Sequence, residues 1–217
     1  MAGPAAGVPA EHGARPRVPE SRRSGRGAVL TDGSGDITGE GRNRAYDPPG
    51  GTDPLQGTPL AHAEMNVLAG VPIRWDLGAC TLWSTQRPCS MCAAALSFTG
   101  VGTVRFLAPD PWAIATRERR AGREVPGTGA PGDDLWVVAA NTLFLLSIVI
   151  RSGPAHKTFV RNEELEPETA AVVAHLVAEG RTGAVLAGDR PLTETLATAW
   201  EAIASAAAAR AARRDAS

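Results

Sequence analysis

The chain has 217 residues and a formal net charge of −1, with 43% hydrophobic and 21% charged residues. This length fits one domain with a full hydrophobic core, and the composition is that of an ordinary soluble globular protein. A net charge near zero gives no global reason to expect a nucleic-acid partner. Both ends of the chain are nevertheless basic, through Arg15, Arg17, Arg22, Arg23 and Arg26 at the start and Arg210, Arg213 and Arg214 at the finish.

Residues 1–27 are rich in Ala, Gly, Pro and Arg and have no hydrophobic period. Such a segment has little to bury, which predicts a disordered basic tail. An alternative is an arm that contacts RNA, because polybasic segments can follow phosphates. The tail lacks the apolar core of a signal peptide, so we expect a cytoplasmic protein.

The first predicted elements form a hairpin. Short β-prone runs at residues 28–31 and 36–40 flank a Gly-rich turn. A loop rich in Pro and Gly follows at residues 45–59. A loop of this length inside a compact domain usually lines a site or is disordered.

Thr58 and Pro59 predict a helix N-cap and first helical position, and the helix should stop near Gly70. An alternation of strands and helices predicts parallel pairing through crossovers, and so an α/β sandwich. The elements expected after this first helix are a strand at residues 79–85, a helix at 89–98 and a strand at 103–107.

The second half gives weaker signals. Residues 117–133 suggest a flexible insertion, and residues 135–150 a buried helix or a strand joined to one. Asn141, Thr142 and Ser147 interrupt this apolar run, which is also shorter than the roughly 18–20 residues of a membrane span. Helices are expected at 166–179 and 191–213. The predicted organisation is a tail (1–27), a main domain (28–160) and a C-terminal helical extension packed on that domain (161–217).

Three cysteines, two of them in a C-x-x-C spacing, argue against a disulfide framework and for metal or redox chemistry. Cys89 and Cys92 lie three residues apart at the start of a predicted helix, so they can share one metal ion. The positive helix terminus favours their thiolate forms. The alternatives are half of a four-ligand structural zinc site or a thioredoxin-like redox pair. Cys80 is expected to be a core residue on its strand and not a fourth ligand.

His62 and Glu64 lie two residues apart, about 200° around a helix axis from each other. Both can approach one ion only if it lies off the N-terminal end of their helix. Two helix N-termini should therefore point at one zinc ion. Three ligands, His62, Cys89 and Cys92, leave a fourth position open, as in catalytic zinc sites. Zinc brings the pKa of a bound water to about 7, and Glu64 is placed to move its proton.

H-x-E followed by P-C-x-x-C is a known signature of zinc-dependent base deaminases. Residues 61–65 (Ala-His-Ala-Glu-Met) and 88–93 (Pro-Cys-Ser-Met-Cys-Ala) resemble the cytidine/deoxycytidylate deaminase superfamily. With histidine before Ala-Glu, they resemble its tRNA adenosine deaminase and guanine deaminase-like branch. The resemblance spans residues 28–112. It implies a three-layer α/β/α cytidine deaminase-like sandwich with a mixed, mostly parallel sheet, to which C-terminal helices are added.

The resemblance also implies a function: hydrolytic removal of an exocyclic amine from a cytosine-, adenine- or guanine-type nucleobase or nucleoside, with release of ammonia. Glu64 would be the catalytic acid and base, His62, Cys89 and Cys92 would bind Zn²⁺, and the residues expected to hold the substrate are Asn43, Ala63 and Pro88. A homodimer without membrane contact is expected. The alternatives are a tRNA-editing adenosine deaminase and a catalytically inactive, zinc-binding interaction protein.

Two features depart from the family pattern. The tail stands where the family usually has a first helix. Arg87 stands before Pro88, where the family usually has glutamate. This reversal of charge beside the metal predicts a changed preference for anions or weaker catalysis.

Overall fold

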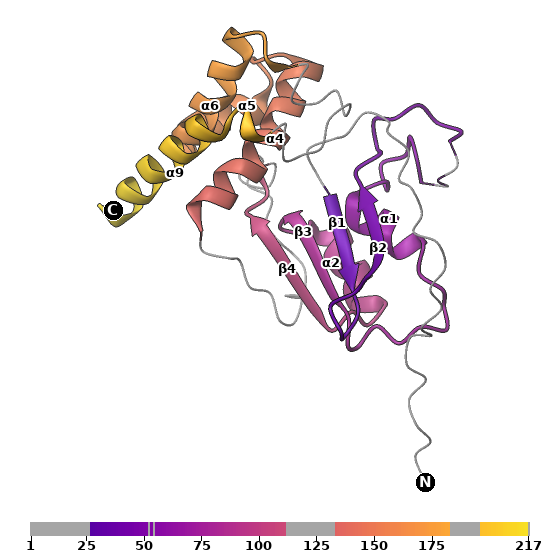
Figure 1. Cartoon of the computed structure of the whole chain (residues 1–217). Helices are drawn as coiled ribbons and strands as arrows, with labels where there is room; N and C mark the ends of the chain where they lie inside the picture. Colours follow the sequence, from indigo (N-terminus) through magenta and orange to yellow (C-terminus); the bar gives the residue numbers. More distant parts are fainter. Residues whose placement is uncertain (1–26, 52, 54, 112–132, 183–195, 217) are drawn as a thin grey trace.

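The computed structural model describes residues 27–51, 53, 55–111, 133–182 and 196–216 (Figure 1). The described chain forms a sheet region, residues 27–111, and a helical cluster, residues 133–216. The tail predicted at residues 1–27 and the insertion predicted at 117–133 lie almost wholly outside the described residues. The strands of the sheet region are β1 (Gly27–Thr31), β2 (Ile37–Arg42), β3 (Thr81–Gln86) and β4 (Thr103–Ala108).

The sheet is mixed, with the strand order β2-β1-β3-β4. β1 pairs antiparallel with β2 and with β3, and β3 pairs parallel with β4. β2, β3 and β4 therefore run in the same direction, and β1 opposes them. The hairpin places β1 beside β2, and the crossover from β2 passes over β1 before the chain enters β3. The predicted α/β class and mixed sheet are confirmed, but only one of the three strand pairings, β3 with β4, is parallel.

Two helices, α1 (Ala63–Ala69) and α2 (Ser90–Phe98), pack on one face of the sheet. Leu30, Leu82 and Val104 lie opposite one another on three neighbouring strands and are fully buried beneath these helices. This apolar row fixes the helices on the sheet through the loss of exposed apolar area. Both helices therefore begin at the end of the sheet where β3 ends.

The predicted start of the first helix at Thr58 and Pro59 is wrong. Thr58 closes a local turn instead: its hydroxyl donates to the carbonyl of Leu55 at 2.7 Å. The helix begins at Ala63, because the backbone of His62 is extended, with φ −69° and ψ 158°, and acts as the N-cap. The later start places His62 directly at the helix terminus.

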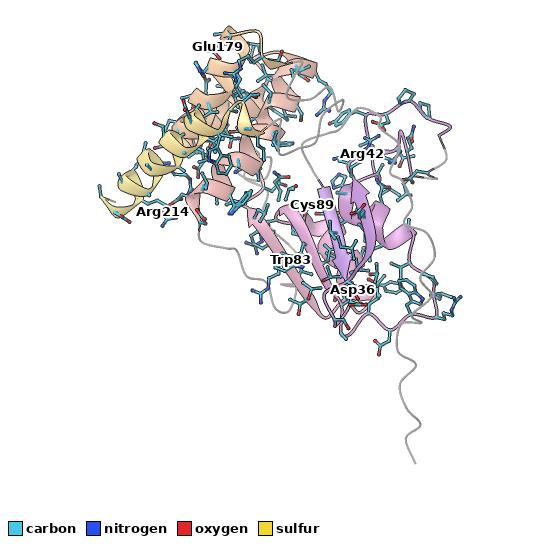
Figure 2. The ribbon with its side chains drawn as sticks, viewed as in Figure 1. Asp36, Arg42, Trp83, Cys89, Glu179 and Arg214 are labelled. Atoms are coloured by element: carbon cyan, nitrogen blue, oxygen red, sulfur yellow. The ribbon has the colours of Figure 1, made fainter. Side chains whose placement is uncertain are left out.

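The other side of the sheet, named here the open face, carries Val29, Trp83 and Arg105 side by side. Trp83 is 45% exposed, and Arg105 is exposed as well. Figure 2 shows the side chain of Trp83 in the sheet region. In the described part of the chain, the second helical layer of the expected sandwich does not appear on this face.

The helical cluster contains a long helix and three others that surround it. Their apolar side chains form one core, in which Leu145, Leu146, Val173 and Ile203 are fully buried. The apolar run that the sequence left open between helix and strand is therefore a helix, and a helix at residues 157–165 was not expected. The four helices are α4 (Asp134–Ser152), α5 (Lys157–Leu165), α6 (Pro167–Ala178) and α9 (Trp200–Asp215).

With 19 residues, α4 is long and apolar enough to cross a membrane by length and composition. Its most apolar window is 72% buried inside the structure, as in the core helix of a globular cluster. The division of the chain at residue 160 stays a prediction; α5 spans that position.

The two regions meet where β3 and β4 end. Ala108 packs against Val137 and Ala140 of α4. The side-chain amide of Gln86 donates to the carbonyl of Ala140 at 2.9 Å, and that of Asn162 donates to the carbonyl of Pro111 at 3.1 Å. These contacts place the start of α4 beside the same edge of the sheet as the N-termini of α1 and α2.

Candidate metal and active site

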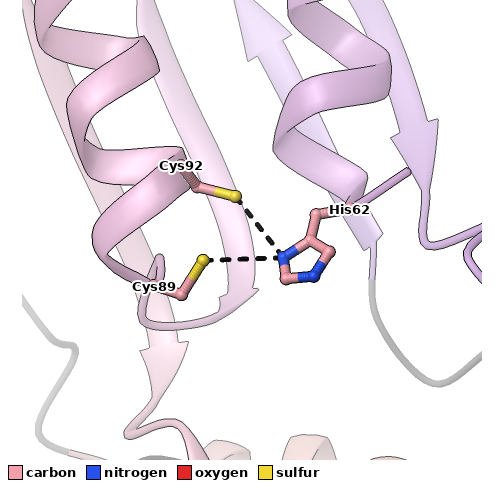
Figure 3. Close-up of side chains that lie close together, drawn as sticks. All are labelled: His62, Cys89 and Cys92. Atoms are coloured by element: carbon pink, nitrogen blue, oxygen red, sulfur yellow. Dashed lines mark hydrogen bonds between the residues drawn. The ribbon is translucent and has the colours of Figure 1, made fainter. Parts of the chain in front are cut away.

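His62, Cys89 and Cys92 come together between α1 and α2 (Figure 3). The Nδ1 atom of His62 lies 3.6 Å from the Sγ atom of Cys89 and 3.6 Å from that of Cys92. The three donor atoms all lie within 4.8 Å of one another. Within the described ranges, this is the only cluster of His, Cys, Asp and Glu that has the spacing of a metal site.

The donor set fits zinc. In a tetrahedral site with Zn–S near 2.3 Å and Zn–N near 2.05 Å, a nitrogen and a sulfur ligand lie about 3.6 Å apart. Both observed N···S distances have this value. Two thiolates and one imidazole are also a common zinc ligand set, and three protein ligands leave one position for water or substrate.

Two helix N-termini point at this site, as the spacing of the motifs predicted. His62 is the N-cap of α1 and Cys89 is the N-cap of α2, both in extended conformation. The first N–H groups of a helix have no partner within the helix and carry partial positive charge. This end of the sheet region therefore favours thiolates, carboxylates and polar substrate atoms.

The two thiols are electrostatically coupled. The side chain of Cys92 lowers the pKa of the Cys89 thiol to about 3, with a smaller contribution from His62 against the effect of burial. The same contact with Cys89, together with burial, raises the pKa of Cys92. One negative charge is thus stable on the pair by itself, and a second requires a cation between the sulfurs.

Glu64 lies beside the donor atoms. It is only 7% exposed, and its Oε2 atom lies 3.5 Å from the Sγ atom of Cys92. Its Oε1 atom accepts a hydrogen bond of 3.1 Å from the hydroxyl of Ser84 on β3. Ser84 thereby fixes the carboxylate in one orientation, with the second oxygen towards the donor set.

A pocket that is partly open to solvent adjoins these residues. Its walls come from both strands and helix N-termini. The lining residues are Asn43, His62, Ala63, Glu64, Ser84, Gln86, Arg87, Cys89 and Asp110.

Of the predicted substrate residues, Asn43 and Ala63 line the pocket, whereas Pro88 is buried directly before Cys89. Asn43 accepts a hydrogen bond of 3.0 Å from the N–H of Ala45, which fixes its amide. The roles of these residues stay predictions.

The sequence did not single out Ser84, Gln86 and Asp110, which also line the pocket. Ser84 and Gln86 alternate with exposed positions on β3 and belong to its buried side. A polar residue at such a position is the signal that would have found them. Asp110 is only 3% exposed and follows the end of β4.

The other cysteine and two of the other histidines lie elsewhere. Cys80 is buried in the core of the sheet region, which raises the pKa of its thiol. His156 caps α5 by accepting from the N–H of Thr158, and His175 on α6 faces Glu179. The position of Cys80 agrees with the core role expected from the sequence.

The fold and the site together define an α/β protein with a His-Cys-Cys zinc-type centre and a buried glutamate beside it. Residues 14–108 match the family model of the cytidine and deoxycytidylate deaminase zinc-binding region. The matched residues include β1 to β4, α1, α2 and the three donor residues of the candidate site. No curated protein matches the chain.

Three solved structures illustrate the range of similar proteins. A tRNA:A34 deaminase, studied for A-to-I editing, is 25% identical over 48% of this chain and 81% of its own, with a TM-score of 0.35. The guanine deaminase of Nitrosomonas europaea is 22% identical over 56% and 71%, with a TM-score of 0.41. The guanine deaminase of Bacillus subtilis is 27% identical over 39% and 50%, with a TM-score of 0.30.

Proposed function

We propose that the protein is a zinc-dependent hydrolytic deaminase that removes the exocyclic amine of a small nucleobase or nucleoside and releases ammonia. The observation that carries the proposal is the position of Glu64, a buried carboxylate 3.5 Å from Cys92 and within the same pocket as the donor set. A zinc ion that only stabilises the fold has no use for such a carboxylate.

His62, Cys89 and Cys92 would hold the zinc ion. When bound, zinc supplies a water whose pKa is near 7 and a Lewis acid next to the pocket. The chain supplies the rest of the chemistry. Ser84 orients the Glu64 carboxylate through Oε1, so that Oε2 faces Cys92 and the donor set.

Glu64 would act twice in the reaction. It accepts a proton from the attacking water and delivers it to the ring nitrogen as the C–O bond forms. It then transfers the second proton of the water to the exocyclic nitrogen while the C–N bond breaks and ammonia leaves. A positioned carboxylate in this role typically contributes 10²–10⁴-fold to the rate.

The pocket lining offers hydrogen-bond partners to a substrate ring. Asn43 contributes a side-chain amide, and the N-terminal turn of α1 at Ala63 contributes backbone N–H groups.

Metal analysis and an ammonia assay test the proposal. We expect one zinc ion per chain, which Cys89→Ser should remove. Glu64→Gln should retain zinc and lower ammonia release from a panel of cytosine, adenine and guanine compounds by about 10²–10⁴-fold. Glu40→Gln is the matched control, because Glu40 is an exposed glutamate on β2.

The panel should include tRNA. Release of ammonia from tRNA alone would move the assignment to an RNA-editing deaminase. A zinc-loaded protein that deaminates nothing in the panel would favour an interaction protein that keeps zinc as a structural element.

A further inference from the structure

The pocket contains a cation that the deamination chemistry above does not use. Arg87 follows the end of β3 and precedes Pro88 and Cys89, and it lines the pocket. Its backbone N–H donates to the carbonyl of Ala108 at 2.8 Å, which ties this position to the end of β4. The base of the side chain is therefore fixed at the rim of the site.

The guanidinium of Arg87 is held by an aromatic ring and not by a carboxylate. Its central carbon lies 5.8 Å from the centroid of the Phe106 ring, and Phe106 is buried. In the part of the chain that the structure describes, no aspartate or glutamate forms an ion pair with Arg87, whereas Arg42, Arg44 and Arg210 are all paired. A cation–π contact orients the guanidinium but leaves its charge uncompensated.

The pocket lining carries charges of both signs. Glu64 and Asp110 are buried carboxylates, which suit the amino and ring N–H groups of a substrate. Arg87 offers planar N–H donors that match a carboxylate or phosphate in bidentate geometry. A ring that presents donors to the carboxylates and an anionic substituent to Arg87 would satisfy both.

On the basis of the proposed deaminase function, we infer that Arg87 forms an anion subsite and that the substrate is an amino-substituted nitrogen heterocycle carrying a phosphate or a carboxylate. The subsite binds the anion by charge-assisted hydrogen bonds. It takes no part in breaking the C–N bond, so Arg87 determines specificity and is not a catalytic residue.

Matched pairs of compounds test this inference. Cytidine is compared with cytidine 5′-monophosphate, adenosine with adenosine 5′-monophosphate, and cytosine with cytosine-5-carboxylate. The wild-type protein should prefer the anionic member of at least one pair by about 10- to 100-fold in kcat/KM, as expected for hydrogen bonds to a charged group. The nucleotide pairs and the carboxylate pair distinguish which anion the subsite takes.

Variants of Arg87 should remove this preference selectively. Arg87→Gln should raise KM for the anionic member about 10- to 100-fold with little change for the neutral member, and Arg87→Glu should disfavour the anion further. Arg105→Gln is the control, because Arg105 is exposed on the opposite, open face of the sheet. An equal loss for both members of every pair, or no preference in the wild type, would overturn the inference.

Binding measured without turnover separates this inference from the proposed function. Titration calorimetry with zinc-loaded Glu64→Gln protein should show tighter binding of the anionic member, and the difference should shrink with added salt. If the wild-type protein releases no ammonia from any compound but binding remains selective for the anion, the deaminase proposal is refuted and the subsite is retained. Deamination with equal binding of both members would refute the subsite alone.

Discussion

The sheet region and the helical cluster both have an apolar core, but their buried polar residues are arranged differently. In the sheet region, Asn43, Glu64, Ser84 and Gln86 are buried and converge on one pocket. The helical cluster also buries polar residues, which are spread over its helices: Asn141, Thr142, Ser147, Thr158, Asn162 and Thr169. Burial of a polar residue therefore points to a site only where several such residues face the same space.

The two regions also differ in how they use charge. In the sheet region, Arg87 has no carboxylate partner among the residues that the structure describes. The helical cluster neutralises Arg210 with two carboxylates, Asp134 at the start of α4 and Glu166 before α6. Charge in the cluster holds helices together, whereas charge in the pocket is available to a ligand. Four substitutions test this difference between the two regions.

The largest effect is expected from truncation of the helical core. Leu145→Ala should lower the free energy of unfolding by about 3 kcal/mol, because Leu145 is fully buried and leaves a cavity. The two cores are separate apart from the small contact at Ala108, so zinc content should not change. Denaturant unfolding and metal analysis check this, with Leu165→Ala, a partly exposed position on α5, as control. Loss of zinc together with helicity would show that the regions unfold as one.

Removal of the Arg210 guanidinium, which pairs with Asp134 and Glu166, should lower the free energy of unfolding by a smaller amount. Arg210→Met should cost about 2 kcal/mol, less than the 3–5 kcal/mol of a fully buried pair, since water reaches part of this cluster. Glu166 accepts two hydrogen bonds from the guanidinium, at 2.7 and 3.0 Å. Thermal unfolding measures the change. Arg214→Met, at an exposed position, should cost well under 1 kcal/mol; equal costs would contradict a specific role for Arg210.

The contact between the regions can be tested at Gln86. Gln86→Leu removes its hydrogen bond to Ala140 and should cost about 1 kcal/mol. It should also raise KM several-fold, because Gln86 lines the pocket. Asn162→Leu removes the second contact, to Pro111, without altering the pocket wall and should affect stability more than KM. The prediction fails if both variants change KM to the same extent.

The smallest effect concerns acid stability. The guanidinium of Arg213 lowers the pKa of the Glu168 carboxyl. A carboxyl with a lowered folded-state pKa stabilises the fold above its unfolded value of about 4.3, and this stabilisation disappears as the pH falls through the folded-state value. Solvent screens the pair, so the contribution is well under 1 kcal/mol. Unfolding curves of Glu168→Gln and of wild type should differ slightly at pH 6 and converge as the pH falls below the folded-state pKa of Glu168. An exposed glutamate control, Glu201→Gln, should follow the wild type at both pH values.

The sequence predicted the zinc-type centre because its determinants are local. Two short motifs place His62 and Cys89 at helix starts, and the spacing of Cys89 and Cys92 fixes one shared face. The hydrogen bond from Ser84 to Glu64 joins residues 20 apart and depends on the register of β3 beneath α1, which no local pattern reveals. The α/β class followed from the alternation of elements.

Two helices show where local signals failed. Thr58 and Pro59 form a good capping pair, but Thr58 bonds back to Leu55 in a local turn and His62 is extended, so the helix starts later. The helix α5 is short and mostly polar, and its N-cap is a histidine, which is an uncommon cap. The helix expected at 191–213 is observed as α9 from Trp200, and residues 183–195 lie outside the described chain.

The packing of β2 against α1 adds a consequence for the metal site. A Cβ atom at Gly41 would lie 2.5 Å from the carbonyl oxygen of Ala63 and 2.9 Å from the N–H nitrogen of Val67. A side chain there would push the first turn of α1, with His62 and Glu64, away from the sheet and from α2. The separation of the three donors sets the radius of the ion that fits between them. Glycine at position 41 therefore helps to keep the three donor atoms within 4.8 Å of one another.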